Sequence, residues 1–186
     1  DKLKVAVEGL PIGEHEGHGF VVADFSKHIE VSEVAQKLVD SSGVDTLINN
    51  TGGPKGGAIS EATVEEFTNT FEQHLLCNHV LAQAVLPGMR ERGHGRIVNV
   101  ISTSVKAPLN GLGVSNTIRG AVANWSKTLA NEEGKHGIRV NNVLPGATNT
   151  ERLQNIIEAK AAKGGVSTDV IQKSMAGAVP AGRFGE

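Results

Sequence analysis

Short runs of apolar residues alternate along this chain with longer segments in which apolar residues recur at helical spacing. The short runs are rich in Val and Ile and are apolar on both faces, unlike a strand that is half exposed to water. Such runs are typical of a parallel sheet that helices cover on each side. The predicted strands are Gly19–Ala23, Thr46–Asn49, Arg96–Ile101 and Arg139–Leu144.

The longer segments carry the apolar stripe of an amphipathic helix. In the first of them, positions 31, 34, 35 and 38 are apolar, which places them on one helical face. Thr63 and Glu66 have the spacing of a capping box, and Gly93 is a stop signal, so one long helix is predicted between them. The predicted helices are Val31–Ser41, Thr63–Arg92, Leu112–Glu133, Glu151–Lys163 and Asp169–Ala176.

Strands and helices follow one another in the order of a doubly wound α/β fold, a Rossmann-type parallel sheet flanked by helices. No linker or repeat divides the chain, so residues 1–186 are predicted to form a single domain. The start, Asp1–Val7, resembles the remains of a helix, and the end, Gly182–Glu186, stops in a loop. We therefore expect a partial, truncated domain whose sheet lacks strands at its edges.

Composition narrows the classes of function. The formal net charge of -2 provides no basic field for nucleic acid or an anionic membrane. The apolar stretches are far shorter than the roughly 20 residues that cross a bilayer, and no export signal opens the chain. The single cysteine, Cys77, allows no internal disulfide, which fits a reducing compartment. We expect a cytoplasmic protein that binds neither nucleic acid nor membrane.

Polar and small residues follow the strand that ends at Asn49. Asn50, Thr51 and Gly52 come directly after it, at the carboxyl edge of the sheet, where open α/β sheets bind ligands. Glycine there allows a ligand to approach the backbone closely. Asn and Gly are also ordinary turn residues, so a simple strand-ending turn explains the same pattern equally well.

Two further strands end in the same manner. Ser102 follows the second, where its hydroxyl can bond a substrate carbonyl, although loop serines without a role are common. Pro145 and Gly146 end the third, and Thr150 is the expected N-cap of a helix whose start can bind an anion. We expect the three strand ends to meet at one groove, with Asn50, Ser102 and Pro145 on its floor.

Four motifs, in the same order along the chain, resemble those of the short-chain dehydrogenase/reductase family. The run Asn49–Gly52 resembles its Asn-Asn-Ala-Gly motif, and Pro145-Gly146 with Thr150 resembles its Pro-Gly motif. Asp24 resembles the family's aspartate that ends a strand and contacts adenine. Gly182–Gly185 resembles the loop just before the family's last helix–strand unit. The resemblance implies NAD or NADP as cofactor, with the preference open. It implies cofactor contacts at Asp24, Phe25, Asn50, Thr51, Gly52, Arg119, Pro145, Gly146, Thr148 and Thr150.

Within the family the chain looks nearest to the 3-oxoacyl-acyl-carrier-protein reductases. The glycine-rich dinucleotide signature after the first strand does not occur in it, so the resemblance implies that the first strand–helix–strand unit and the last strand are absent. We expect the chain alone to bind cofactor poorly, because that turn holds the pyrophosphate. The resemblance also implies a homodimer or homotetramer through Thr63–Arg92 and Leu112–Glu133, and a substrate lid over Glu151–Ala181. Trp125 and Leu76 are candidates for that interface or, more ordinarily, for the core.

The resemblance also implies an altered catalytic centre. Ser102 occupies the place of the family's serine, but Ser115 stands at the tyrosine place, Arg119 at the lysine place and His74 at the asparagine place. The chain contains no tyrosine at all. A serine hydroxyl titrates far above neutral pH, and arginine stays protonated, so neither replaces a tuned tyrosine. His74 is the member of this group expected to exchange a proton near pH 7.

Two functions remain open. In the first, the protein is an oxidoreductase that transfers hydride between nicotinamide and a small carbonyl or alcohol substrate, with 3-oxoacyl thioesters as one candidate class. Ser102 and Arg119 then polarise the carbonyl, and His74 supplies the proton through water or Ser115. In the second, it is a cofactor-binding protein without effective catalysis, which acts as a sensor or partner subunit. His74 as an ordinary helix histidine also stays open.

A metal site is not expected. His15 and His18 with neighbouring glutamates form a polar loop, but no second pair of ligands on a rigid element accompanies them. A solvated loop is the simpler interpretation.

Overall fold

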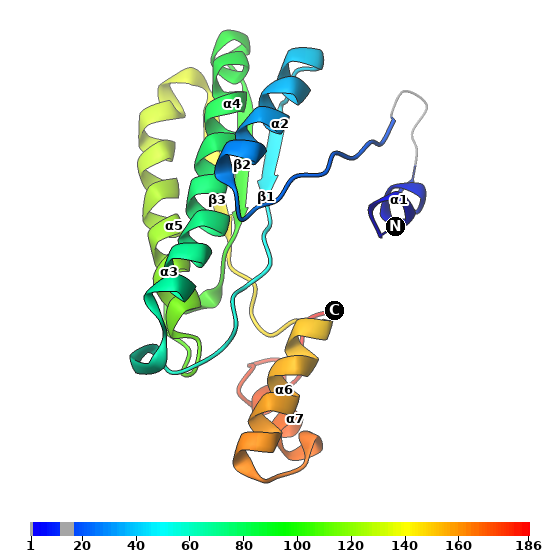
Figure 1. Ribbon diagram of the computed structural model, residues 1–186, viewed down its shortest axis with the longest axis vertical. Coiled ribbons are helices and arrows are strands. Elements are labelled where there is room, and N and C mark those ends of the chain that lie inside the picture. The colour runs from blue at the N-terminus through cyan, green and yellow to red at the C-terminus, as the bar shows by residue number, and fades with distance from the viewer. Residues whose placement is uncertain (1, 12–16) are drawn as a thin grey trace.

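The computed structural model describes residues 2–11 and 17–186. Within them lies a parallel sheet of three strands in the order β1 (Thr46–Asn49), β2 (Gly95–Val100) and β3 (Ile138–Val143) (Figure 1). Three of the four predicted strands are therefore confirmed, each within one residue. Because the strands are parallel neighbours, their carboxyl ends lie at one edge of the sheet.

The predicted strand Gly19–Ala23 is wrong. These residues have extended, irregular backbone and pair with no strand among the described residues. Val21 and Val22 are 56% and 72% exposed, so the apolar run that suggested a buried strand is not buried here. A strand needs a neighbour for its backbone N–H and C=O groups, and β1, β2 and β3 pair only with one another.

The predicted helices are present, with one interruption. The long helix expected over 63–92 is divided by a π-helical segment, Glu72–Leu76, in which His74 lies. Gly93 ends its second half in the left-handed conformation, with φ of 64°. Such π-helical turns are rare and are frequently found at functional sites. The helices are α1 (Lys2–Glu8), α2 (His28–Ser41), α3 (Val64–Phe71), α4 (Cys77–Arg92), α5 (Gly113–Glu133), α6 (Glu151–Gly164) and α7 (Thr168–Gly177).

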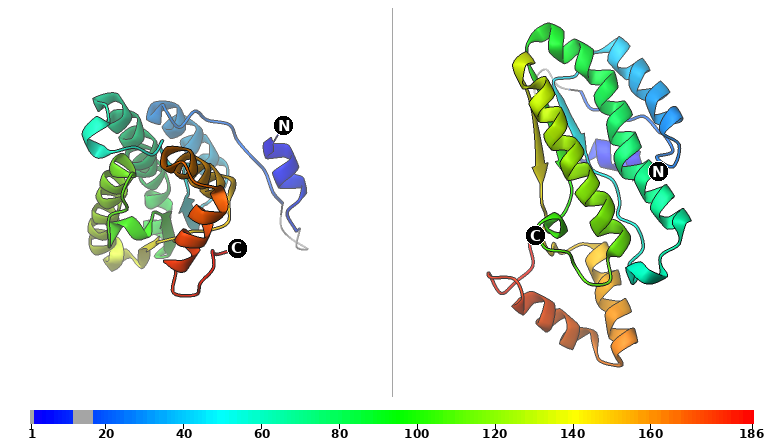
Figure 2. Two further views of the ribbon diagram at one scale, coloured as in Figure 1. Left: turned by 90° about the horizontal axis from the view of Figure 1, so that it is seen from below. Right: turned by 90° about the vertical axis from the view of Figure 1, so that its left-hand side faces the viewer.

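The main core lies between one face of the sheet and helices α4 and α5. Met89 of α4 and Ile97 of β2 are fully buried there, and Trp125 of α5 packs against the same cluster, as its core interpretation predicts. Figure 2 shows the strands on one side and α2, α4 and α5 together on the other. The remaining core members are Ala82, Val85, Leu86, Ile138 and Val140.

The opposite face of the sheet is open, which corrects the expectation of helices on both sides. Ile48 is 63% exposed and Val143 is 49% exposed. Side chains alternate between the two faces of a strand, so the same strands bury Asn49 and Ile97 on the helix side. None of the described helices packs on this second face; α1, α6 and α7 lie away from the sheet (Figure 1).

Helices α6 and α7 form a separate unit beyond the carboxyl edge of the sheet (Figure 1). Leu153, Ile157 and Phe184 make a second small core there. Thr150 caps α6 by accepting a hydrogen bond from the backbone N–H of Leu153 at 3.4 Å, as predicted. This unit coincides with the segment expected to be the lid. No helix in the described part of the chain is long and apolar enough to cross a membrane.

Candidate functional site

The loops that follow β2 and β3 run side by side at the carboxyl edge. The backbone N–H of Ile101 donates to the carbonyl of Val143 at 2.9 Å, and that of Thr103 donates to Pro145 at 3.2 Å. Ser102 lies between these two bonds, so it is held beside Pro145 as the predicted convergence requires. Asn50, at the end of β1, is exposed at the same edge.

Beneath this edge lies a buried ladder of asparagines that sequence reasoning missed. Asn49, Asn99 and Asn142 are neighbours across the three strands. The amide of Asn49 donates to Asn99 at 2.8 Å, and the amide of Asn99 donates to Ser126 at 2.5 Å and to Asn142 at 3.3 Å. The Ser126 hydroxyl in turn donates to Asn142 at 2.7 Å. The sequence feature that could have revealed this ladder is the asparagine near the end of each predicted strand.

Thr51 is the point at which the candidate side chains meet. One guanidinium nitrogen of Arg119 donates to the Thr51 carbonyl at 3.3 Å, and another donates to the carbonyl of Val100 at 2.6 Å. The hydroxyl of Thr51 bonds Nδ1 of His74. Side chains from α5 and from the π-helical segment therefore converge on the loop after β1. Of the residues selected from the sequence, the structure therefore brings Thr51, Arg119 and His74 together.

His74 is buried and electrostatically unusual. It is 1% exposed, and its Nε2 atom has no hydrogen-bond partner among the described residues. Burial, and then the positive charges of Arg119 and Arg152, lower the pKa of His74 to about 4. The imidazole is therefore neutral at pH 7, which corrects the expectation that it exchanges protons near that pH in this state. A neutral ring can still donate or accept one hydrogen bond at each nitrogen.

Arg152 joins the site although the sequence analysis did not select it. Its guanidinium donates to the carbonyls of Gly53 at 2.8 Å and of Pro54 at 2.9 Å. It lies in the first turn of α6, where the helix dipole favours acidic residues. An arginine in this unfavourable position is the sequence feature that could have pointed to a role for Arg152. Burial, and then the charge of Arg152, lower the pKa of Arg119.

The three serines near the second strand end have different surroundings. The Ser102 hydroxyl accepts the backbone N–H of Ser104 at 3.0 Å and so caps the turn Thr103–Val105. The hydroxyl of Ser104 is buried without a partner in the described structure. Ser115 precedes Arg119 by one turn of α5, so the two share a helix face. No hydrogen bond of the described residues joins Ser115 to Ser102.

The residues expected around the adenine end have local roles in the structure. The Asp24 carboxylate accepts bonds from the backbone N–H of Ser26 at 2.9 Å and from its hydroxyl at 2.7 Å, and these bonds lower the pKa of Asp24. The carbonyl of Phe25 accepts from the Cys77 thiol at 3.2 Å. Since Gly19–Ala23 is not a strand, Asp24 does not lie at a strand end as predicted.

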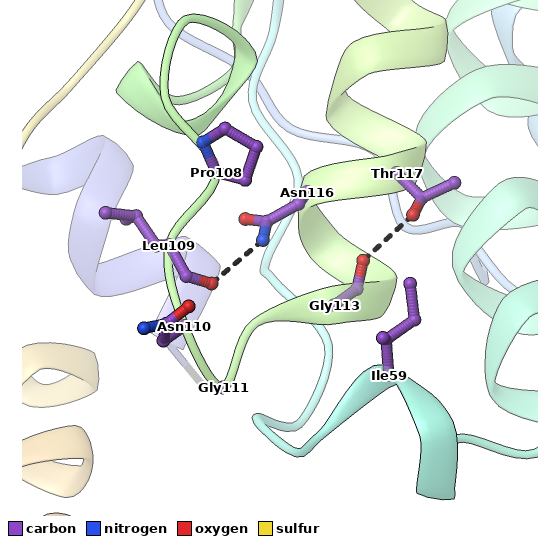
Figure 3. A pocket seen from close by; sticks show the side chains of 8 residues that line it. All are labelled: Ile59, Pro108, Leu109, Asn110, Gly111, Gly113, Asn116 and Thr117. Atoms are coloured by element: carbon purple, nitrogen blue, oxygen red, sulfur yellow. Dashed lines mark hydrogen bonds between the residues drawn. The ribbon is translucent and has the colours of Figure 1, made fainter.

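Two cavities lie near α5 rather than over the strand ends. The larger, of about 410 Å³, is formed by the turn before α5, its first turn and Ile59 (Figure 3). The second, of about 160 Å³, lies around residues 55–66 and Val114. Asn50, Ser102 and Pro145 line neither, so the groove expected above them is not one of these two cavities. The lining of the larger is Ile59, Pro108, Leu109, Asn110, Gly111, Gly113, Asn116 and Thr117.

The remaining cofactor candidates lie on the loops of this edge or next to them. Gly52 and Gly146 are exposed, Thr148 is half-buried, and Thr150 is exposed at the start of α6. Among the described residues no group of three His, Cys, Asp or Glu side chains could hold a metal. His18 instead bonds the carbonyl of Pro11 at 2.8 Å, and His15 lies outside the described residues.

Known proteins are similar to this chain over most of its length. A protein of Streptomyces virginiae, assigned as a ketoacyl reductase of monensin polyketide synthase, is 31% identical over 88% of this chain and 64% of its own length. A protein assigned as a ketoacyl reductase in Streptomyces coelicolor is 33% identical over 83% of this chain and 60% of its own length. The chain thus spans less than two thirds of these relatives.

The fold is also that of solved structures. L-sorbose reductase from Gluconobacter frateurii, crystallised with NADPH and L-sorbose, superposes with a TM-score of 0.79 at 31% identity. The superposition covers 89% of this chain and 64% of that protein. The family model for short chain dehydrogenases matches residues 11–161. With the parallel sheet and the motifs at its carboxyl edge, this match shows that the chain belongs to the short-chain dehydrogenase/reductase family.

Proposed function

We propose that this protein is an NAD(P)-dependent oxidoreductase that transfers hydride between nicotinamide and a carbonyl or alcohol carbon. The observation that carries the proposal is the convergence of Arg119 and His74 on Thr51, at the edge where open α/β sheets bind ligands. Membership of the family supports the same reaction class.

The nicotinamide cofactor supplies the hydride when it is bound. Residues after β1 (Asn50, Thr51, Gly52) and after β3 (Pro145, Gly146, Thr148, Thr150) would hold it, with Asp24 and Phe25 toward its adenine end. The unpartnered Nε2 of His74 fits the proposal, because a buried donor or acceptor normally has a partner. NADPH is the cofactor in the L-sorbose reductase structure, and the choice between NAD and NADP in this protein stays open.

The substrate oxygen would be held by Ser102 and Arg119. The Ser102 hydroxyl can donate a hydrogen bond to a carbonyl oxygen, and the permanent charge of Arg119 stabilises the alkoxide that forms when hydride reaches the carbon. Ser115, one turn from Arg119, would pass a proton to that alkoxide from water. His74 is neutral at pH 7 and can supply a proton only when a nearby negative charge raises its pKa.

Turnover measurements test this proposal. NADPH and NADH oxidation are followed against 3-oxoacyl thioesters, ketones and aldehydes, because the two Streptomyces relatives are assigned as ketoacyl reductases. Removing an oxyanion-stabilising group usually costs about 10²–10³ in kcat, and we expect that range for Arg119→Ala. Ser102→Ala and His74→Ala are expected to lose activity as well. Arg139→Gln removes a charge from the open sheet face and serves as the control.

One result would favour a cofactor-binding protein without catalysis. If the cofactor binds, no substrate is turned over, and the pair Ser115→Tyr with Arg119→Lys creates activity, the enzyme proposal fails. Such a result would mean that catalysis needs the family's tyrosine and lysine, and that Ser115 and Arg119 do not form a different acid–base system in their place.

The same proposal includes a single domain and a cytoplasmic homo-oligomer. The family resemblance points to α3, α4 and α5 as the interface between subunits. Sedimentation equilibrium is expected to give a dimer or tetramer, and a monomer at micromolar concentration would contradict this part of the proposal.

A further inference from the structure

Two arginines from distant parts of the chain donate to the loop after β1. Arg119 of α5 bonds the Thr51 carbonyl, and Arg152 of α6 bonds the carbonyls of Gly53 and Pro54. A guanidinium has five N–H donors. Each arginine uses two of them on backbone carbonyls, so each keeps three for another partner.

Neither arginine has an acidic partner in the described structure. The ion pairs found there involve other residues, such as Arg90 with Glu133 and Arg92 with Asp45. The two guanidinium charges are close enough for Arg152 to lower the pKa of Arg119. Like charges held together without a counterion repel, and an anion bound between them removes that repulsion.

His74 supplies a third polar group beside the arginines. The Thr51 hydroxyl bonds its Nδ1 atom, and its Nε2 atom is buried without a partner. When the hydroxyl donates to Nδ1, the neutral ring carries its proton on Nε2. The buried ring then presents a donor that has no acceptor, and such a donor is costly to leave unpaired.

We propose that Arg119, Arg152 and His74 form a subsite for an anionic oxygen group, a carboxylate or a phosphate, beside the loop 51–54. Its place in the reaction rests on the proposed function. The anion belongs either to an acidic substrate or to a phosphate of the cofactor. Guanidinium groups match both, because their parallel N–H bonds fit two oxygens of one group. Arg152 is exposed, so a ligand can reach it from solvent.

Gly53 gives Arg152 its position. A Cβ atom at Gly53 would lie 2.5 Å from one guanidinium nitrogen of Arg152 and 2.6 Å from its central carbon. The guanidinium is the flexible end of a long side chain and can move away. Gly53→Ala is therefore expected to displace Arg152 from the subsite while the fold and the charge stay the same.

Calorimetric titration with sodium pyrophosphate and, separately, with sodium succinate tests the subsite. We expect saturable binding at one site in the unaltered protein. Loss of a charge-assisted contact weakens binding by about tenfold or more, so this loss is expected for Arg119→Gln, Arg152→Gln and Gly53→Ala. The control Arg139→Gln removes an exposed arginine at the opposite end of β3 and is expected to change the dissociation constant less than about twofold.

Repeating the titrations with saturating NADPH distinguishes the two sources of the anion. Succinate that still binds assigns the subsite to an acidic substrate, and displacement of pyrophosphate by NADPH assigns it to the cofactor. Absence of saturable binding, or equal binding in Arg152→Gln and Arg139→Gln, overturns the subsite. If both anions bind at this site but no carbonyl substrate supports the oxidation of NADPH or NADH, the proposed function fails while the subsite stands.

Discussion

At the scale of residues, the asparagine ladder is the polar group most tightly built into the core. Asn99 is fully buried and bonds three partners: Asn49, Ser126 and Asn142. Replacing Asn99 by Ala leaves these buried partners short of hydrogen bonds, and we expect the free energy of unfolding to fall by about 3 kcal/mol. Urea unfolding measures it.

The matched control for that substitution is at Asn141, which directly precedes the ladder's third member, Asn142, and lies on the opposite face of β3. Asn141→Ala changes an exposed side chain on the open sheet face, and its effect is expected to stay within about 0.5 kcal/mol. Equal losses in the two variants would mean that the ladder contributes nothing specific to stability.

Burial of His74 makes the free energy of unfolding depend on pH between the pKa values of the unfolded and the folded ring. The unfolded ring binds a proton below pH 6.5, whereas the folded ring binds one only near pH 4, so the folded state loses stability as the pH falls between these values. From pH 6.5 to 4.5 the loss is about 2 kcal/mol. His74→Asn removes it. Urea unfolding of the unaltered protein and of His74→Asn is compared at several pH values. Equal losses of stability in the two proteins would contradict His74 as the cause.

At the scale of elements, apolar periodicity predicted most of the structure because it reports which face is buried. It located β1, β2 and β3, and every predicted helix is present. It failed at Gly19–Ala23, because an apolar run cannot show whether a neighbouring strand exists to pair with it. It also missed the π-helical segment Glu72–Leu76, because the start and stop signals in the sequence locate only the ends of a helix.

The ends of α4 and α5 are joined by a bidentate ion pair. Arg90 donates to the two carboxylate oxygens of Glu133 at 2.8 Å and 2.5 Å, and these bonds lower the pKa of Glu133. Because Arg90 is partly exposed, we expect Glu133→Gln to cost only about 1–2 kcal/mol at pH 7. This contribution is present above pH 4.5 and is lost as the pH falls further.

Glu132→Gln is the matched control for this ion pair, since Glu132 is exposed and forms none of the described ion pairs. Thermal unfolding of the two variants is compared at pH 7 and at pH 3.5. A difference between them that persisted unchanged at pH 3.5 would contradict the electrostatic explanation.

At the scale of the whole molecule, the sequence indicated which edge carries the site but not how its side chains connect. Parallel order alone brings Asn50, Ser102 and Pro145 to one edge. The contact of Arg152 with Gly53 joins residues about a hundred positions apart through a helix packed on its own small core, and no local pattern encodes that docking. The depressed pKa of His74 likewise depends on burial that only the assembled fold creates.

The two separate cores imply two levels of stability. The sheet with α4 and α5 buries the large cluster around Met89 and Ile97, whereas α6 and α7 share only a small one. Regions with few buried contacts open at lower free energy, so amide hydrogens of α6 and α7 are expected to exchange with solvent at least tenfold faster than those of α4 and β2. Hydrogen exchange followed by NMR or mass spectrometry measures both.

Substitution of Arg152 tests the faster hydrogen exchange of α6 and α7 more specifically. Its bonds to Gly53 and Pro54 connect α6 to the loop after β1, so Arg152→Gln is expected to speed exchange in α6 and α7 and leave α4 unchanged. Lys160→Gln, an exposed charge change within α6, is the control. Uniform exchange across the molecule, or acceleration in α4 as well, would mean that the two cores unfold together, and the α6–α7 unit could then not move independently over a bound ligand.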